Sequence, residues 1–425
     1  MSARLRRVVL VVLAALLGLG LVQAASPSTS LSGSSTDGGD SGSPTEEDTS
    51  YRFLSAPDFM NADVADLSGQ PRWRPGMPNS WNTSWATATD TVMDAFEAEA
   101  PEDVLVAGDL VNGHWGVEPS GVFGPVGTEA ERQAAVRRAA AAYFPAWRQL
   151  FDDRGLPVHV AVGDHEVGDN DWAGSDKNEF KRRNLGLFKE EFSRYALLPD
   201  RYDSRPAGPA NRTAYAVRLA PEVQLVTVDV FERTGDDVVP RLDPQQLRWL
   251  DDVLARAQAD GVDWIMVQGH VPVARPVRQT SSSGLYYEGG AASPFWRTLA
   301  RHDVDLYLAG EVHDTTAVRR DGVMQISHGG MFGHGGHDGR GGTSYLVGQV
   351  EGDTLDLVAK RFRVSHTEGE GERLWQATSQ GQPPLEKTFV PTPDVIGTMR
   401  LTADGEVLSM DGQLGPYLPG GSDAD

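Results

Sequence analysis

The chain has 425 residues, of which 40% are hydrophobic and 23% are charged, so it can bury a core and is not disordered throughout. It carries 60 acidic and 38 basic residues, and its formal net charge of -22 repels phosphate backbones. We therefore expect no nucleic-acid polymer and no anionic membrane among its partners. Cysteine is absent, which excludes disulfides, thiolate metal ligands and cysteine nucleophiles.

The first 50 residues have the composition of an export signal followed by a spacer. Three arginines precede an apolar run over residues 8–22, and Val22-Gln23-Ala24 offers a small-residue cleavage site. We interpret residues 1–24 as a signal peptide and residues 25–50, rich in Ser, Thr and Gly, as a disordered spacer. This predicts a secreted or extracytoplasmic protein with no stable membrane span after cleavage. An uncleaved N-terminal membrane anchor is the alternative.

From residue 51 onward, short apolar runs end abruptly in a polar residue, usually after glycine. Because these runs are rich in Val and Leu, they predict strands that are buried on both faces. They cover residues 53–57, 104–108, 158–163, 264–269 and 306–310. A further run, Val223 to Val228, ends at Asp229, for which we favour a structural role.

Helical patterns lie between these runs. Apolar spacing predicts helices over 90–100 and 128–153, and Pro145 is expected to kink or split the second one. Asp243-Pro244 and Ser293-Pro294 each combine an N-cap with a first-turn proline. The alternation of strand and helix predicts an α/β domain with much parallel sheet.

Hairpin signals follow toward the C-terminus. Asp321-Gly322, Gly352-Asp353 and Asp404-Gly405 each lie beside apolar runs, which predicts antiparallel strands in that part of the chain. We expect the domain to span residues 51–366 and residues 367–425 to form a short peripheral C-terminal extension.

Polar side chains gather where the predicted strands end. Open α/β sheets bind ligands outside the carboxyl ends of their strands, so these side chains are expected to converge. Carboxylates and imidazoles in one place form a plausible site for one or two divalent metal ions. The alternative is a purely structural role, in which each aspartate is only a turn or N-cap residue. The candidate ligands are Asp58, Asp109, Asp164, His270, Glu311 and His313.

The order of these residues resembles the calcineurin-like metallophosphoesterases over roughly residues 51–362. The resemblance rests on Asp58, Gly108-Asp109, Gly163-Asp164-His165-Glu166, Gly269-His270 and Gly310-Glu311-Val312-His313. It implies a β-sandwich flanked by helices in αββα layers, and hydrolysis of phosphomonoesters or phosphodiesters with two metal ions.

The resemblance also implies a role for each matching residue. Asp109 would bridge the metals, with Asp58 and His313 on the first and Asp164, His270 and Glu311 on the second. His165 would lie near the leaving-group oxygen as an acid or an electrostatic stabiliser, and Glu166 would orient it.

Three positions depart from the family pattern. The first motif is Asp-x-His in the family, but here Phe59 and Met60 follow Asp58, and Asn61 or Asp63 are the nearby replacements. Asp164 stands where the family has Asn, and Glu311 where it has His. The resulting set of four carboxylates and two imidazoles favours hard ions (Mn, Mg, Ca or Fe) over Zn. The first site could be weak or empty.

Two accessory segments carry further polar residues. Asn112 or His114 could lie over the substrate phosphate, or could belong to a polar loop that Trp115 packs down. The Gly- and His-rich run over 327–342 could be an anion-binding nest, an extra metal site or a mobile loop.

These features predict an exported, metal-dependent phosphoesterase that hydrolyses a small phosphomonoester or phosphodiester by attack of a metal-bound hydroxide. The alternative is a non-catalytic metal- or anion-binding extracellular module on the same fold. The missing histidine after Asp58 favours that alternative, whereas the retained His165-Glu166 pair favours the enzyme. The sequence does not choose between monoester and diester.

Overall fold

The computed structural model describes residues 50–58, 63–70, 72–75, 83–117, 122–169, 176–235, 237–279, 282–330, 344–365 and 388–418. The expected signal peptide, the expected spacer apart from Ser50, Asn61 and most of the Gly- and His-rich run lie outside these residues. No helix among the described residues has the length and apolar character needed to cross a membrane.

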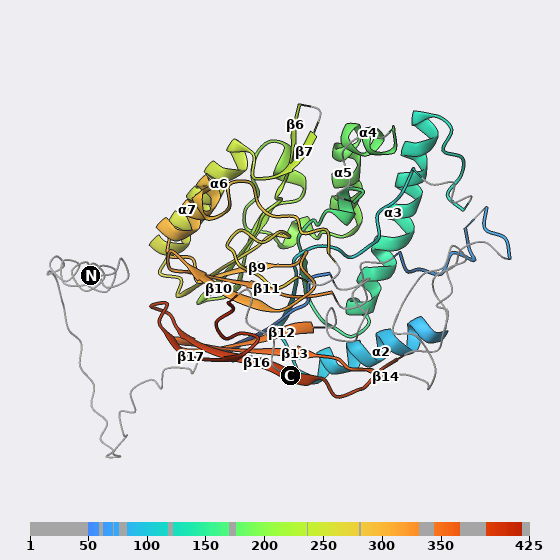
Figure 1. The fold of residues 1–425 in the computed structure, drawn as a ribbon. Coiled ribbons are helices and arrows are strands. Elements are labelled where there is room, and N and C mark those ends of the chain that lie inside the picture. Colours follow the sequence, from blue (N-terminus) through green and yellow to red (C-terminus); the bar gives the residue numbers. More distant parts are fainter. Residues whose placement is uncertain are drawn as a thin grey trace, which may run out of the picture. The chain divides into compact units, whose positions relative to one another are not determined.

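Two mixed sheets form the centre of the domain (Figure 1). The seven-stranded sheet has the order β17-β16-β13-β12-β1-β2-β3, and the six-stranded sheet has the order β10-β11-β9-β8-β5-β4. The first comprises β1 (Ser50–Ser55), β2 (Asp103–Val106), β3 (Val158–Val160), β12 (Ser344–Glu351), β13 (Thr354–Arg361), β16 (Asp394–Thr402) and β17 (Val407–Gly412). The second comprises β4 (Tyr215–Ala220), β5 (Val223–Thr227), β8 (Trp264–Gln268), β9 (Leu306–Ala309), β10 (Thr316–Arg320) and β11 (Val323–Ser327). The remaining strands form two short pairs, β6 (Phe231–Thr234) with β7 (Asp237–Pro240) and β14 (Val364–Ser365) with β15 (Thr388–Phe389).

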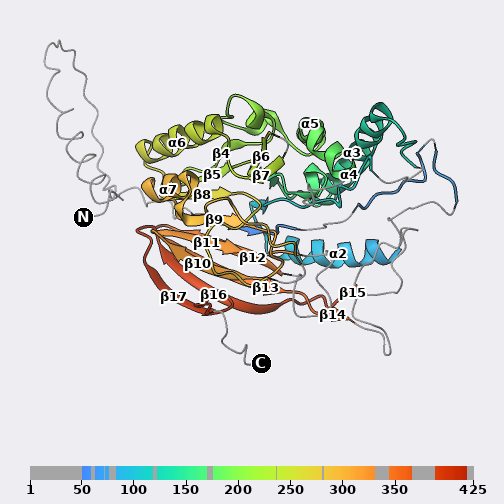
Figure 2. The same cartoon turned by 45° about the horizontal axis from the view of Figure 1, so that its top comes forward.

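Helices flank these sheets, and Figure 2 shows α6 and α7 on the side of the six-stranded sheet that faces away from the seven-stranded one. The α-helices are α2 (Thr83–Ala98), α3 (Glu129–Asp152), α4 (Asp176–Arg183), α5 (Leu185–Tyr195), α6 (Pro244–Ala259) and α7 (Pro294–Arg301). The 3-10 turns are η1 (His165–Val167), η2 (Pro199–Arg201), η3 (Pro209–Arg212) and η4 (Gly290–Ala292). This is the predicted α/β architecture, and the sheets in the described part of the chain do not close into a barrel.

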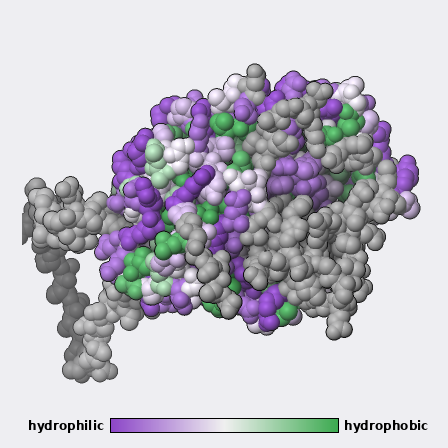
Figure 3. Space-filling view, viewed as in Figure 1, coloured by the Kyte–Doolittle hydropathy of each residue, from purple (hydrophilic) through white to green (hydrophobic). Residues whose placement is uncertain are grey.

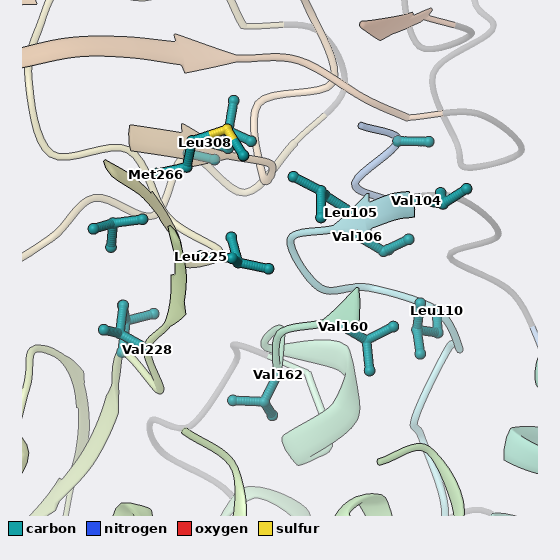
Figure 4. Packing of buried hydrophobic residues seen from close by; sticks show 14 of the residues in the cluster. Val104, Leu105, Val106, Leu110, Val160, Val162, Leu225, Val228, Met266 and Leu308 are labelled. Atoms are coloured by element: carbon teal, nitrogen blue, oxygen red, sulfur yellow. The ribbon is translucent and has the colours of Figure 1, made fainter. Parts of the chain in front are cut away.

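The apolar strand residues pack between the two sheets. Leu105 of β2, Met266 of β8 and Leu308 of β9 are almost completely buried, and Figure 4 shows their side chains among the packed residues from both sheets. Burial of such side chains supplies most of the driving force for folding. Two hydrogen bonds also cross between the sheets, from Tyr215 Oη to the Val160 carbonyl at 2.9 Å and from Gln268 Nε2 to the His159 carbonyl at 3.2 Å. Both fix the strands whose ends carry the candidate ligands.

The surface has the opposite character. On the face shown in Figure 3 most of the coloured residues are hydrophilic, and hydrophobic residues form only small groups. This distribution agrees with the strongly acidic composition.

Local capping signals account for the helix starts. Thr128 and Glu131 form a capping box at α3, and the side chains of Asp243 and Ser293 accept backbone amides at α6 and α7, as predicted. Pro145 does not split α3, contrary to one of the two expectations. The buried Phe144 and Trp147 hold the helix against the core on both sides of the proline.

The predicted hairpins are confirmed. Asp321-Gly322 joins β10 to β11, Gly352-Asp353 joins β12 to β13, and Asp404-Gly405 lies between β16 and β17. Within the stretch that we expected to be peripheral, β16 pairs with β13 along its length and β17 forms the edge of the seven-stranded sheet.

His328 links the two sheets from a buried position. It follows β11, is 1% exposed, and its Nε2 lies 3.0 Å from Ser55 Oγ and 3.2 Å from the Ser55 carbonyl in β1. Burial lowers the pKa of His328 to about 4, so the imidazole is neutral at pH 7. The beginning of the Gly- and His-rich run is therefore part of the core.

This burial predicts a specific pH dependence of stability. The folded-state pKa of His328 lies below the value near 6.5 expected in the unfolded chain, so stability is highest above pH 6.5 and falls as the pH drops toward 4. His328→Gln keeps a donor for Ser55 but cannot titrate. Between pH 7 and pH 4 we expect the wild type to lose about 3 kcal/mol more unfolding free energy than this variant. Denaturant titrations at both pH values measure the difference, and equal losses would contradict the neutral buried imidazole.

Candidate metal centre

The six candidate ligands lie directly beyond the ends of five strands. β1, β2 and β3 are parallel, as are β8 and β9, so each set of carboxyl ends points to the same edge of its sheet. Asp58, Asp109 and Asp164 follow the first set, and His270, Glu311 and His313 follow the second. The packing of the two sheets brings these edges together.

Four of these residues adopt a backbone conformation that is rare outside glycine. The φ angles are 52° for Asp58, 61° for Asp109, 67° for Glu311 and 52° for His313. Such left-handed residues persist only where the surrounding structure enforces them, and they cluster at functional sites. Here the Asp58 amide donates to the Gly108 carbonyl at 2.9 Å, which fixes one of these bends.

The neighbouring glycines leave room for the carboxylates. A Cβ atom on Gly163 would overlap the Asp109 carboxylate, and one on Gly310 would overlap the Asp58 carboxylate. The glycines of the sequence pattern are therefore required by close approach of the backbone to the acidic groups.

Two sets of ligand atoms converge. Asp58, Asp109 and His313 each offer an atom within 4.8 Å of the others, and so do Asp164, His270 and Glu311. Asp109 joins the two sets, because its Oδ2 lies 3.3 Å from His270 Nε2. We call these sets the first group and the second group. Every member is less than 5% exposed.

His270 shows why the second group fits a cation. Its Nδ1 lies 2.7 Å from the Ala107 carbonyl, which assigns the ring proton to that nitrogen. Its buried Nε2 faces Asp164 Oδ1 at 2.9 Å, Asp109 Oδ2 at 3.3 Å and Glu311 Oε2 at 3.5 Å, without a hydrogen bond of good geometry to any of the described residues. A nitrogen lone pair among three acidic oxygens requires a positive charge, from either a second proton or a metal ion.

The pKa values of these groups report the same crowding. Burial and the neighbouring Asp164 raise the pKa of Asp109 and of Glu311. Burial opposes protonation of His270, but Asp109, Asp164 and Glu311 raise its pKa well above the usual value. Four buried carboxylates cannot all ionise beside one another without a compensating cation, so the residues present fit one or two divalent ions.

His165 lies at the more open side of the two groups. Its Nδ1 is 2.8 Å from the Asn112 carbonyl and its Nε2 is 3.9 Å from Asp109 Oδ2. Burial opposes protonation, but the charges of Asp109 and Asp164 raise the pKa of His165 to about 10. The Asn112 carbonyl therefore fixes the ring through Nδ1, and the neighbouring carboxylates favour a second proton on Nε2.

Glu166 does not orient His165, and this expectation is corrected. Its Oε2 accepts the backbone amides of Asp109 at 2.8 Å and Gly163 at 2.7 Å, and its Oε1 accepts the Leu110 amide at 2.7 Å. Adjacent side chains in the η1 turn point in different directions. The Glu166 carboxylate therefore contacts the backbone amides of Asp109 and Gly163, while the His165 ring contacts the Asn112 carbonyl. Glu166 therefore positions the backbone of Asp109.

The segment that contains Asn112 and His114 is held by Asp63. The Asp63 carboxylate accepts the Asn112 amide at 3.0 Å and Trp115 Nε1 at 2.8 Å, so it anchors this loop and does not join either group. Asn112 contributes its carbonyl to His165, and its side chain has no described role. Trp115 is buried, as the alternative reading of this loop expected.

His114 has a partner that the sequence did not reveal. Its Nε2 contacts the Asp169 carboxylate, and its ring stacks on His165 with centroids 6.1 Å apart. Ligand atoms of His114, His165 and Asp169 lie within 4.8 Å of one another at the partly exposed rim of the centre. The only sequence signal for Asp169 was its position five residues after Asp164.

A cavity of about 410 Å³ is lined by residues of α5 and of β6, among others. Figure 1 shows where these two elements lie. Phe231 lines it, and the Phe231 ring centroid is 6.2 Å from that of His270. Lys189 and Asp229 also line it and form a buried ion pair at 2.6 Å, in keeping with the structural role expected for Asp229. Phe231 therefore lies between this cavity and His270, and none of the candidate ligands lines the cavity.

Comparison with known proteins identifies the class to which this fold and site belong. Residues 83–314 match the family model for calcineurin-like phosphoesterases, which is more than half of the chain. The protein belongs to this family and is a metal-dependent hydrolase that acts on phosphoester bonds.

Several solved structures are similar. A dimetal phosphatase from Danio rerio is 14% identical with a TM-score of 0.42, over 72% of this chain and 95% of that one. PhoD is 14% identical with a TM-score of 0.48, over 88% and 73%. Purple acid phosphatase PPD1 from yellow lupin (Lupinus luteus) is 12% identical with a TM-score of 0.46, over 74% and 52%. The curated proteins contain no match.

The three hydrogen bonds of Glu166 predict the effect of Glu166→Gln. The amide group of glutamine cannot accept all three backbone donors, so we expect the variant to lose about 2 kcal/mol of unfolding free energy. Its metal affinity should fall about tenfold, because the Asp109 backbone loses its support. Thermal unfolding and calorimetric metal titration measure the two effects.

Glu191→Gln is the matched control. Glu191 is equally buried but pairs with Arg194 on α5, away from both groups. It should change stability without changing metal affinity. Equal metal affinities for the wild type and Glu166→Gln would contradict the positioning role.

Proposed function

We propose that the protein is an exported phosphoesterase that hydrolyses small phosphomonoesters or phosphodiesters at the centre formed by the first and second groups. The observation that carries this proposal is the convergence of two buried sets of ligand atoms on Asp109. Such a pair of sites can hold two ions close enough to act on one phosphoryl group.

The ligand chemistry favours hard ions. Asp58, Asp109 and His313 would hold the first ion, and Asp164, His270 and Glu311 the second, with Asp109 shared. Four carboxylates and two imidazoles suit Mn, Mg, Ca or Fe better than Zn. When bound, the ions supply Lewis acidity that activates water and stabilises charge on the phosphoryl oxygens.

His165 is proposed to protonate the leaving group. The Asn112 carbonyl holds Nδ1, which leaves Nε2, 3.9 Å from Asp109 Oδ2, as the nitrogen available for proton transfer. A proton donated to the departing oxygen lowers the cost of breaking the ester bond. His114, stacked on His165 and bonded to Asp169, lies where it could contact the same substrate.

The strongly acidic composition, which repels phosphate backbones, supports a small substrate. The proposed export rests on the signal pattern in residues 1–24, and sequencing the N-terminus of the protein from the producing cell tests it.

The metal requirement gives the first test. Protein stripped with chelator should not hydrolyse a chromogenic phosphomonoester or phosphodiester, and Mn²⁺, Mg²⁺, Ca²⁺ or iron should restore turnover better than Zn²⁺. Asp109→Asn should abolish turnover with every ion, because the shared ligand is lost. Asp305→Asn, which is also a buried aspartate but lies directly before β9 and accepts the Ile265 amide, should retain it. If Asp109→Asn turned over substrate at nearly the wild-type rate, the proposal would be contradicted.

The leaving-group role of His165 gives the second test. His165→Ala should lower kcat by roughly 100-fold or more while metal affinity changes little. The loss should be smaller for a 4-nitrophenyl ester than for an alkyl ester, because nitrophenolate departs without protonation. Steady-state kinetics with both esters measure this, and equal losses for the two would rule out the acid role.

A further inference from the structure

The two oxygens of Glu311 have different surroundings. Oε1 accepts the Ser283 hydroxyl and the Leu285 backbone amide, the latter at 3.0 Å. Oε2 faces His270 Nε2 at 3.5 Å within the second group. Both lone pairs of Oε1 are therefore occupied by donors, and only Oε2 remains for an ion.

We propose that Ser283 is a positioning residue that makes Glu311 a one-oxygen metal ligand, so that the second group prefers a six-coordinate ion such as Mn²⁺ to Ca²⁺. This rests on the proposed metal centre. Ca²⁺ takes six to eight oxygens and often binds carboxylates through both oxygens, whereas Mg²⁺ and Mn²⁺ suit octahedral sites with single-oxygen ligands. A glutamate whose second oxygen already accepts two hydrogen bonds cannot bind Ca²⁺ through both oxygens.

A tight turn directs both donors to the same oxygen. Gly284 has φ of 73°, a conformation that glycine adopts without strain, and its amide donates to Ser282 Oγ at 3.2 Å. The Ser283 hydroxyl and the Leu285 amide then lie on one side of the turn. Ser283 itself is exposed, whereas Glu311 is 3% exposed, so the turn covers the carboxylate from the outside.

The turn is anchored independently of the candidate ligands. Arg278 Nη1 donates to the Thr315 carbonyl at 3.0 Å and to the Gln413 carbonyl at 3.2 Å. Its guanidinium also lies over the Tyr417 ring, 4.4 Å from the centroid. Thr315 is two residues beyond His313, so the segment that holds Glu311 and the bend that holds His313 share one anchor. The chain before Ser283 is thus anchored at Arg278 by contacts that involve none of the candidate ligands.

The test is a calorimetric titration of chelator-stripped protein with Mn²⁺ and, separately, with Ca²⁺. Glu311→Gln identifies the binding step that belongs to the second group. For that step we expect the wild type to bind Mn²⁺ more tightly than Ca²⁺. Ser283→Ala should weaken Mn²⁺ binding about tenfold and Ca²⁺ binding less, so that the preference for Mn²⁺ shrinks. Ser283→Thr retains the hydroxyl and should restore the preference.

Ser282→Ala is the matched control, because Ser282 Oγ accepts the Gly284 amide and does not touch Glu311. Wild-type preference in Ser283→Ala, or an equal loss in Ser282→Ala, would overturn the inference. Turnover is measured separately. If Mn²⁺ binding depends on Ser283 but the protein does not turn over phosphoesters, only the proposed hydrolysis is contradicted. If the protein turns over phosphoesters but its preference for Mn²⁺ over Ca²⁺ is unchanged in Ser283→Ala, only this inference is contradicted.

Discussion

The charge of four buried carboxylates is the constraint on which the centre depends. Asp58, Asp109, Asp164 and Glu311 are each almost completely buried, and their separation is too small for all of them to be ionised without a cation. The surrounding structure is organised to hold them in spite of this. Left-handed bends aim them inward, glycines make room for them, and Glu166 binds the backbone beneath Asp109. A positive charge at the centre, from protons or from metal ions, offsets this repulsion.

Local sequence patterns were sufficient to predict much of the fold. Apolar runs bounded by glycine predicted the strands, and Asp243 and Ser293 predicted two helix starts, because strand burial and capping depend on neighbouring residues. The same logic placed the candidate ligands, since a residue directly after a buried parallel strand must lie at the edge of the sheet. The structure brings all six together. Their roles as ligands stay a prediction until metal binding is measured.

Contacts between distant parts of the chain could not be predicted in this way. Glu166 follows His165 directly, but its hydrogen-bond partners are Asp109 and Leu110 in another loop, and no periodicity reports such a pairing. Ser283 looks like any loop serine until the fold sets it against Glu311. The pairing of β16 with β13 depends on a register that is set across a long connection, and composition does not report it. Composition alone therefore predicted a peripheral extension for residues 367–425.

The anchor formed by Arg278 and Gln413 has a consequence for biosynthesis. Ribosomes produce the chain from its N-terminus, so all six candidate ligands exist before Gln413 and Tyr417 have been made. The Arg278 side chain then lacks one of its two backbone acceptors and its aromatic partner. The anchor of Arg278 is therefore completed late, after the strands that extend the seven-stranded sheet have been added. A nascent or C-terminally clipped chain would carry every candidate ligand but only the Thr315 part of this anchor.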